Sequence, residues 1–311
     1  MQDEMLETAP HSFTWNESQL RFISCPDCHA DRHVPVLKRH DRLFIVRCAR
    51  CGLAFVYPQP STEELARFYK SGYFGGNSDF HRGTDYFEQR RKGIEAGALT
   101  GAALLANLDL TGLRVVEIGA ADGALLAWCK SRGAAEAIGI EFTEEAAAWG
   151  RARYGLRMIC SALDENAFPA GSVDLVIAID LIEHLQNPKS FMAACAKWLV
   201  SGGRLAILCP NGSAISFWGK RWIGVQENME HLTYLTRRQF VRWAKEFQFV
   251  LERHSYEGCP LRRAQYRSAG SRTHRILHEP HKAAYNTMIK LLTAVMPASS
   301  RHQQEMILRR L

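Results

Sequence analysis

The spacing of hydrophobic and polar positions changes along the chain and predicts two kinds of structure. Between residues 113 and 208, short apolar runs alternate with segments of helical periodicity. The apolar runs that we predict as strands cover 115–118, 137–140, 157–160, 173–179 and 204–208. Helices are expected at 124–130, 144–154, 190–199 and 236–247, and further strands at 249–254 and 304–308. Strands that alternate with helices indicate an α/β fold with a doubly wound, mostly parallel sheet that is covered on both faces.

The first sixty residues follow a different pattern. Alternating apolar and polar positions from Leu43 to Arg47 predict a hairpin strand that ends in the second of two Cys-x-x-Cys pairs. Ser61 is placed to cap a helix whose first turn is acidic. These boundaries predict four segments: a flexible tail (1–19), a small cysteine module (20–58), a helical linker or cap (59–108) and a main domain (109–311) with an insertion at about 258–300.

Four of the nine cysteines form two pairs, Cys25 with Cys28 and Cys48 with Cys51, and nineteen residues separate the pairs. Zinc binds four ligands in a tetrahedron, and two such pairs supply two thiolates each. The spacing therefore predicts a structural zinc ribbon, whose closed site stabilises the module and does not catalyse. A redox Cys-x-x-Cys pair is the alternative interpretation.

Composition and charge constrain the partners more than the fold. A hydrophobic content of 47% and a charged content of 23% are typical of a globular protein. We find no run of about 18 apolar residues, so we predict no membrane span. The polar N-terminus does not resemble a secretory signal, so we expect a cytoplasmic protein.

The net charge of +7 resides in residues 251–311, which hold eleven Lys or Arg against four Asp or Glu. This segment is either a solvated helical surface or a contact for an anionic partner.

A strand-to-helix turn rich in small residues carries the main functional signal. The strand over 115–118 contains Glu117, and a helix begins a few residues later. The intervening turn contains Gly119, Ala121 and Gly123. Glycine in such a turn lets the backbone approach a bound ligand closely, so we expect a cofactor here.

Further candidate ligands follow the next three strands at the same predicted edge. Glu141 ends the second strand, where a carboxylate can accept hydrogen bonds from both ribose hydroxyls of a nucleoside. Phe142 is placed to lie against adenine, Ala162 and Leu163 follow the third strand and would bracket that ring, and Asp180 ends the fourth strand. Together these residues predict a nucleoside site.

The order of these motifs resembles that of class I S-adenosylmethionine-dependent methyltransferases. The chain has E-x-G-x-x-x-G over 117–123, "DLIEHL" over 180–185 and "HLTYLT" over 231–236, and the last two are similar to the "DVLEHL" and "HLHFFT" signatures of one broad family of these enzymes. The resemblance extends to the cysteine pairs and to "CGLAFVYPQPSTEELARFY". It implies a Rossmann-like sheet of seven strands and S-adenosylmethionine as the cofactor, with Glu117 and Gly119 at its methionine part and Glu141 at its ribose.

One position departs from the family, because Ala121 stands where the family usually has glycine. If the backbone φ angle of Ala121 is positive, the departure implies weaker cofactor binding. Dinucleotide-binding dehydrogenases use G-x-G-x-x-G, whose second glycine would fall on Ala121. The sequence therefore favours a methyltransferase over a dehydrogenase of the same fold. A degenerate, non-catalytic fold is the other alternative.

An oxygen nucleophile of high pKa must lose its proton, and Glu183, His184 and His231 are the predicted catalytic groups. With Asp180, these residues also resemble the acid-x-x-Glu-His cluster of metal-dependent O-methyltransferases, including small-RNA 2′-O-methyltransferases and ubiquinone-pathway enzymes. That resemblance implies a second divalent ion at Glu183, His184 and His231. The alternative is that Glu183 and His184 only cap a helix, while one histidine acts as base or positioning group.

The function predicted from the sequence is methyl transfer from S-adenosylmethionine to a small molecule, most simply to an oxygen of a natural product, quinone or sugar. An anionic substrate would suit the basic C-terminal segment. One alternative is an RNA methyltransferase, suggested by the zinc module and the basic C-terminus. Another is a non-catalytic, cofactor-binding scaffold whose zinc module binds a protein. The sequence predicts no oligomeric state.

Overall fold

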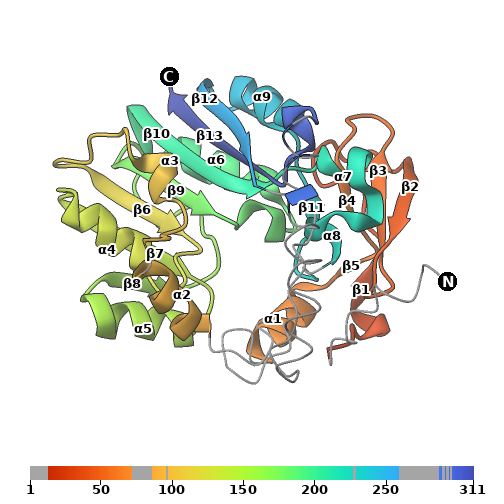
Figure 1. The fold of residues 1–311 in the computed structure, drawn as a ribbon, viewed down its shortest axis with the longest axis horizontal. Coiled ribbons are helices and arrows are strands. Elements are labelled where there is room, and N and C mark those ends of the chain that lie inside the picture. The colour runs from red at the N-terminus through yellow and green to blue at the C-terminus, as the bar shows by residue number, and fades with distance from the viewer. Residues whose placement is uncertain are drawn as a thin grey trace.

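The computed structural model describes residues 13–71, 86–95, 97–226, 229–258, 287, 288, 291, 294 and 296–311 (Figure 1). Within these residues, a large sheet with its covering helices lies beside a smaller sheet formed mainly by the N-terminal module (Figure 1). No helix in the described part of the chain is long and apolar enough to cross a membrane.

The large sheet has seven strands in the order β12-β13-β10-β9-β6-β7-β8. The strands are β6 (Arg114–Ile118), β7 (Glu136–Glu141), β8 (Arg157–Cys160), β9 (Val173–Ile179), β10 (Leu199–Pro210), β12 (Phe249–Glu257) and β13 (Gln303–Arg310). All pairs from β10 to β8 are parallel, whereas β13 is antiparallel to both of its neighbours. The predicted Rossmann-like, mostly parallel sheet of seven strands is confirmed.

The central strands are apolar because helices cover both faces of the sheet. In β6 and β9 nearly every residue is buried, including Val116, Leu175 and Ile177. The helices of this part are α4 (Ala124–Ser131), α5 (Glu144–Tyr154), α6 (Pro188–Trp198), α7 (Ala214–Trp218), α8 (Ile223–Gln226) and α9 (Arg237–Glu246). Every strand and helix predicted between residues 113 and 254 is present, with ends that shift by a few residues.

The smaller sheet has four strands in the order β11-β4-β3-β2. Three come from the N-terminal module: β2 (His33–Lys38), β3 (Phe44–Cys48) and β4 (Ala54–Tyr57). The fourth, β11 (Thr233–Tyr234), belongs to the predicted main domain and pairs antiparallel with β4. Two short strands, β1 (Leu20–Arg21) and β5 (Gln59–Pro60), also pair with each other. The two parts therefore share a sheet, which the sequence did not predict.

Residues 13–19 differ from the predicted flexible tail. Phe13 and Trp15 are buried against Phe68 of α1 (Thr62–Lys70), and the rings of Trp15 and Phe68 stack at a centroid distance of 5.4 Å. Residues 1–12 lie outside the described residues. The start of the chain that we describe is therefore fixed by aromatic packing.

The remaining predictions concern the linker and the insertion. In the helical linker, α2 (Tyr86–Glu95) and α3 (Ala102–Leu105) are separate helices, and Gly97 and Gly101 between them have positive φ angles of 81° and 86°. Most of the predicted insertion over 258–300 lies outside the described residues. The domain boundaries stay predictions.

Candidate functional site

A pocket of about 540 Å³ opens at the carboxyl ends of the parallel strands. Its volume is in the range of small-molecule sites, and in open α/β sheets ligands bind at this edge. All the predicted cofactor and catalytic residues line it except Gly123. They are Glu117, Gly119, Ala121, Glu141, Phe142, Ala162, Leu163, Asp180, Glu183, His184 and His231. The structure therefore brings together residues that are up to 114 positions apart in the sequence.

The turn between β6 and α4 has three residues with positive φ: Gly119 (70°), Ala121 (46°) and Gly123 (75°). A side chain at Gly123 would approach Leu156 to 2.8 Å, so Gly123 acts in packing the turn and not in lining the pocket. Ala121 adopts the left-handed region that normally favours glycine. Its methyl group packs against a cluster that includes Phe87.

Glu117 is the most perturbed acid of the cofactor side. The residue is 4% exposed, and its Oε2 atom has no hydrogen-bond partner among the described residues. Burial raises the pKa of Glu117 to about 8, although the positive charge of Arg90 opposes this shift. Arg90, on α2, also lines the pocket and forms an ion pair with Asp122 at 3.2 Å. A buried carboxylate oxygen without a partner suits a cationic ligand group.

Glu141 has a different role in the same turn. Its Oε2 accepts a hydrogen bond from Ala121 N at 2.9 Å, and its Oε1 accepts from Thr143 N at 2.9 Å. Oε1 also accepts a hydrogen bond from the hydroxyl of Thr143 at 3.1 Å. Oε2 therefore keeps a lone pair for one ribose hydroxyl, and a second ribose hydroxyl would replace the Thr143 hydroxyl at Oε1. The ring of Phe142 is 44% exposed and lies edge-on to Tyr69 at 5.8 Å. An exposed aromatic face beside Glu141 suits a nucleobase.

Glu183, His184 and His231 form a cluster at the other end of the pocket. Glu183 and His184 lie in a 3-10 turn, Ile182–His184, directly after β9. Glu183 Oε1 lies 4.0 Å from His184 Nε2 and 3.9 Å from His231 Nε2. Within the part of the chain that the structure describes, neither carboxylate oxygen of Glu183 has a hydrogen-bond partner. The ligand atoms of the three residues all lie within 4.8 Å of one another. The three side chains can coordinate a metal ion, and they can also accept or donate a proton.

Burial sets the protonation of this cluster. It raises the pKa of Glu183 well above its ordinary value and lowers the pKa of His184 to about 4. The pKa of His231 is also held well below its ordinary value by burial and by the neighbouring His184. His231 Nδ1 lies 3.2 Å from the carbonyl oxygen of Gly224, which can only accept, so the proton of the neutral ring is on Nδ1. Its Nε2 lone pair is therefore free to face the pocket.

The structure adds pocket residues that the sequence did not suggest. Tyr69 of α1 places its hydroxyl 3.1 Å from His184 Nδ1, and Gln303 of β13 donates to Asp180 Oδ1 at 3.1 Å. His302 lines the pocket and accepts a hydrogen bond from Trp222. Trp222 itself is fully buried outside the pocket, so it is a core residue.

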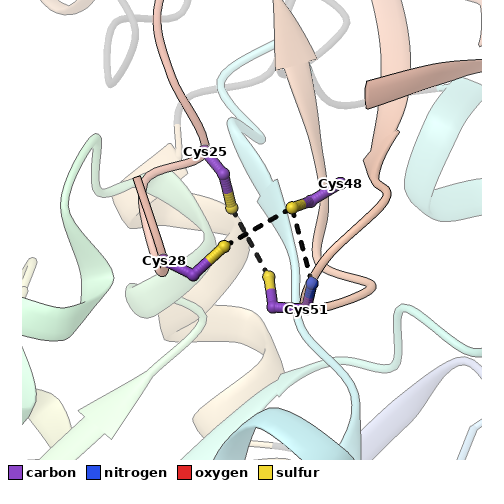
Figure 2. A group of neighbouring side chains, drawn as sticks. All are labelled: Cys25, Cys28, Cys48 and Cys51. Carbon is purple, nitrogen blue, oxygen red and sulfur yellow. Dashed lines mark hydrogen bonds between the residues drawn. The ribbon is translucent and has the colours of Figure 1, made fainter. Parts of the chain in front are cut away.

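The four predicted metal ligands converge on one point (Figure 2). The Sγ atoms of Cys25 and Cys51 are 3.5 Å apart, and those of Cys28 and Cys48 are also 3.5 Å apart. A disulfide would require about 2.05 Å, whereas tetrahedral zinc with bonds of about 2.3 Å spaces its sulfurs by about 3.8 Å. The backbone N–H of Cys51 also points at Cys48 Sγ at 3.5 Å. The cysteines fit a four-thiolate zinc site.

Comparison with known proteins agrees with this geometry. A family model described as a methyltransferase domain matches residues 86–254, which is more than half of the chain. The chain belongs to this methyltransferase domain family, and its fold is that of class I S-adenosylmethionine-dependent methyltransferases. The predicted family is thereby confirmed. The family model does not include the cysteine module, so the zinc ribbon stays a prediction.

Individual relatives match over shorter stretches. The ubiquinone biosynthesis O-methyltransferase of Xanthomonas oryzae pv. oryzae is 31% identical over 119 residues, which are 36% of this chain and 49% of that protein. The protein of the same name from Aromatoleum aromaticum is 31% identical over 105 residues, covering 32% and 44%. The chain thus spans about half the length of the curated relatives it matches.

A solved structure supports the fold. A chain of the complex between the Haloferax volcanii Trm112 methyltransferase activator and a methyltransferase superposes with a TM-score of 0.51. The identity is 13%, and the alignment covers 71% of this chain and 92% of that chain. At this identity the likeness concerns the fold alone.

Proposed function

We propose that this protein transfers the methyl group of S-adenosylmethionine to a hydroxyl oxygen of a small molecule. The observation that carries the proposal is that Glu183, His184 and His231 open on the same pocket as the Gly119 turn. Proton-accepting and metal-binding groups beside a methyl donor are what an oxygen nucleophile requires. The relatives named ubiquinone biosynthesis O-methyltransferase support an oxygen acceptor.

The cofactor end of the pocket offers a complementary group for each polar part of S-adenosylmethionine. Glu117 Oε2 is buried and no described residue bonds to it, which suits the ammonium group, and the guanidinium of Arg90 suits the carboxylate. Glu141 Oε2 has a free lone pair for a ribose hydroxyl. Phe142 and Leu163 border the place where the adenine ring would lie. The residues present therefore fit this cofactor.

In the proposed reaction, the protein orients the reactants, excludes water and removes a proton. When bound, S-adenosylmethionine supplies a methyl group that its sulfonium makes electrophilic. The Nε2 lone pair of His231 accepts the proton of the acceptor hydroxyl, because Nδ1 is held by Gly224. Tyr69 fixes the ring of His184 through Nδ1, so that His184 Nε2 also faces Glu183. Both imidazoles are neutral at pH 7 and so available as acceptors.

The same three side chains fit a divalent cation as an alternative. The two carboxylate oxygens of Glu183 accept no hydrogen bond from the residues that the structure describes, and two imidazole Nε2 atoms lie near 4 Å from one of them. A cation there would lower the pKa of a bound hydroxyl. The histidines would then be ligands and not bases, so dependence on added metal distinguishes the two roles.

We also propose that the four cysteines hold a structural zinc ion. The Sγ distances and the backbone N–H directed at Cys48 Sγ support this. All four positions are filled by thiolates, so the ion would have no open position for substrate. Its contribution would be to the stability of the module.

The proposed function is tested with the full-length, zinc-loaded protein and radiolabelled S-adenosylmethionine. The acceptors are phenols, catechols, sugars and aliphatic alcohols, each compared with the matching amine and thiol, with EDTA or with Mg²⁺. We expect label in a hydroxyl compound and a loss of about 100-fold or more in His231→Ala, the usual contribution of a general base. His254→Gln is the control, because His254 lies on β12 outside the pocket lining. Transfer only to amines, thiols or RNA would contradict the proposal.

A further inference from the structure

We infer that Arg39 of the N-terminal module is a positioning residue for the pocket, because it holds the Met229–His231 segment that carries Glu230 and His231. Glu230 and His231 both line the pocket, and both are buried. The inference rests on the proposed function, since it assumes that His231 takes part in the reaction. It gives the module a part in forming the pocket, beyond binding zinc.

Arg39 lies between β2 and β3 and is 3% exposed. Its Nη1 donates to the carbonyl oxygen of His231 at 2.6 Å and to the hydroxyl of Tyr234 at 3.2 Å, and its Nη2 donates to the carbonyl oxygen of Met229 at 2.6 Å. Asp41 accepts the two remaining hydrogen bonds, from Nε at 3.1 Å and from Nη2 at 2.5 Å. All five donors of the guanidinium group are thus used.

The carbonyl groups that Arg39 binds flank Glu230 on both sides. The backbone of residues 229–231 is therefore held at two points, and the side chain between them is held with it. Asp41 could pair with Arg39 within the module alone. The contacts to Met229 and His231, however, join segments that are 190 and 192 residues apart in the sequence.

The next residues of the same segment are fixed from both parts of the molecule. Leu232 N donates to the carbonyl oxygen of Glu183 at 2.8 Å, and the carbonyl oxygen of Leu232 accepts from Val56 N of β4 at 2.8 Å. Thr233 then pairs with Phe55, where β11 joins the module's sheet (Figure 1). The segment thus connects the turn that carries Glu183 to the module, and His231 lies within this connection.

Burying a guanidinium group is unfavourable unless the charge is paired and its donors are satisfied. The planar fork of arginine meets both conditions here, whereas a lysine ammonium has only three donors and a different geometry. A lysine at position 39 could therefore keep the ion pair with Asp41 but not both carbonyl contacts. This difference makes Arg39→Lys more informative than removal of the charge.

The test compares Arg39→Lys and Arg39→Met with Arg47→Lys in the full-length, zinc-loaded protein. Arg47 is the matched control, because it lies on β3 of the same module and donates to Gly52 within that module at 3.2 Å. Hydrogen–deuterium exchange is followed in peptides that cover 229–236 and 114–118. Affinity for S-adenosylhomocysteine is measured by calorimetry, and kcat and KM are measured with the hydroxyl acceptor found above.

We expect the Arg39 variants to exchange about tenfold faster or more in 229–236 and at the parent rate in 114–118, because the opening is local. A catalytic group displaced by about 1 Å can lose about 100-fold in rate, so kcat should fall about tenfold or more, whereas affinity for S-adenosylhomocysteine should change by less than about twofold. Arg47→Lys should change neither the exchange rate of 229–236 nor kcat.

If Arg39→Met does not fold, Arg39→Lys and Asp41→Asn supply the same comparison. The inference is overturned if 229–236 exchanges at the parent rate in a folded Arg39 variant, or if both peptides accelerate equally. It is also overturned if kcat is unchanged. If the parent protein methylates no hydroxyl acceptor, the proposed function fails, and the exchange data still decide whether Arg39 holds the segment.

Discussion

Replacing Glu117 by Gln removes a buried charge while it keeps the shape of the side chain. Glu117 is 4% exposed, its Oε2 has no hydrogen-bond partner in the described part of the protein, and burial raises its pKa to about 8. The folded protein therefore holds this proton more tightly than the unfolded chain does. The stabilising contribution of the protonated form is complete below pH 4.5 and is lost as the pH rises from 4.5 to about 8.

The size of the effect follows from the two pKa values. A rise from 4.5 to about 8 corresponds to at most about 5 kcal/mol in the free energy of unfolding. In Glu117→Gln this pH dependence disappears, so the variant should be more stable than the parent above pH 8. Near pH 4.5 that advantage should vanish.

Although Glu117→Gln should stabilise the protein above pH 8, it should weaken binding of the cofactor. The ionised form of Glu117 pairs with the ammonium of S-adenosylmethionine, and loss of a hydrogen bond between charged groups is worth about 1.5–3 kcal/mol. The dissociation constant should therefore rise about 10-fold to 100-fold in Glu117→Gln. Because the free parent is protonated at pH 7, its affinity should increase from pH 6 to pH 8 as the carboxyl group ionises, whereas the affinity of the variant should not.

Chemical denaturation and calorimetry with S-adenosylmethionine, both at pH 6, 7, 8 and 9, measure these effects. The control is Glu144→Gln, because Glu144 begins α5 and its side chain is 66% exposed. The reasoning would be refuted if Glu117→Gln bound the cofactor as tightly as the parent with the same pH dependence, or if it gained no stability at pH 9.

Four further predictions concern the turn, the ribose, the carboxylate and the zinc site. Ala121→Gly should raise the free energy of unfolding by up to about 1 kcal/mol, because the left-handed strain of alanine exceeds the entropy that glycine loses; a loss of more than about 1 kcal/mol in chemical denaturation would contradict this. Glu141→Ala should weaken S-adenosylhomocysteine binding about tenfold or more in calorimetry, since a hydrogen bond to a carboxylate is lost; unchanged affinity would remove the ribose assignment. Arg90→Leu should weaken S-adenosylmethionine about tenfold but leave adenosine binding unchanged, and an equal loss for both ligands would argue against a carboxylate contact. Elemental analysis should find about one zinc per chain, and Cys48→Ser or a strong chelator should lower the melting temperature; a metal-free protein of the same stability would exclude the zinc site.

The elements of the large sheet could be predicted because their signals are local. β8 and β9 have the predicted ends, since each is a short apolar run bounded by polar or turn residues. The edge that collects Glu117, Glu141 and Asp180 also follows from the sequence, because parallel strands place their carboxyl ends together. The cysteine pairs could be predicted for the same reason, because only two residues separate the cysteines of each pair.

Other features depend on contacts that no local pattern records. Nothing near Arg39 indicates that its charge is buried against carbonyl groups about 190 residues later. Trp15 was assigned to a tail because its partner, Phe68, lies in another segment. Arg90 lies on a helix with a mostly polar sequence, and only the fold turns it toward the pocket. Such side chains are identified by tertiary structure.

The central claim is that acids at successive strand ends bind S-adenosylmethionine beside the turn at Gly119. A crystal structure of the full-length protein with S-adenosylhomocysteine tests it most directly. We predict that the ribose hydroxyls lie on Glu141, that the amino group of the methionine part reaches Glu117, and that the sulfur faces His231. A ligand bound elsewhere, or one whose ribose makes no contact with Glu141, would contradict the account.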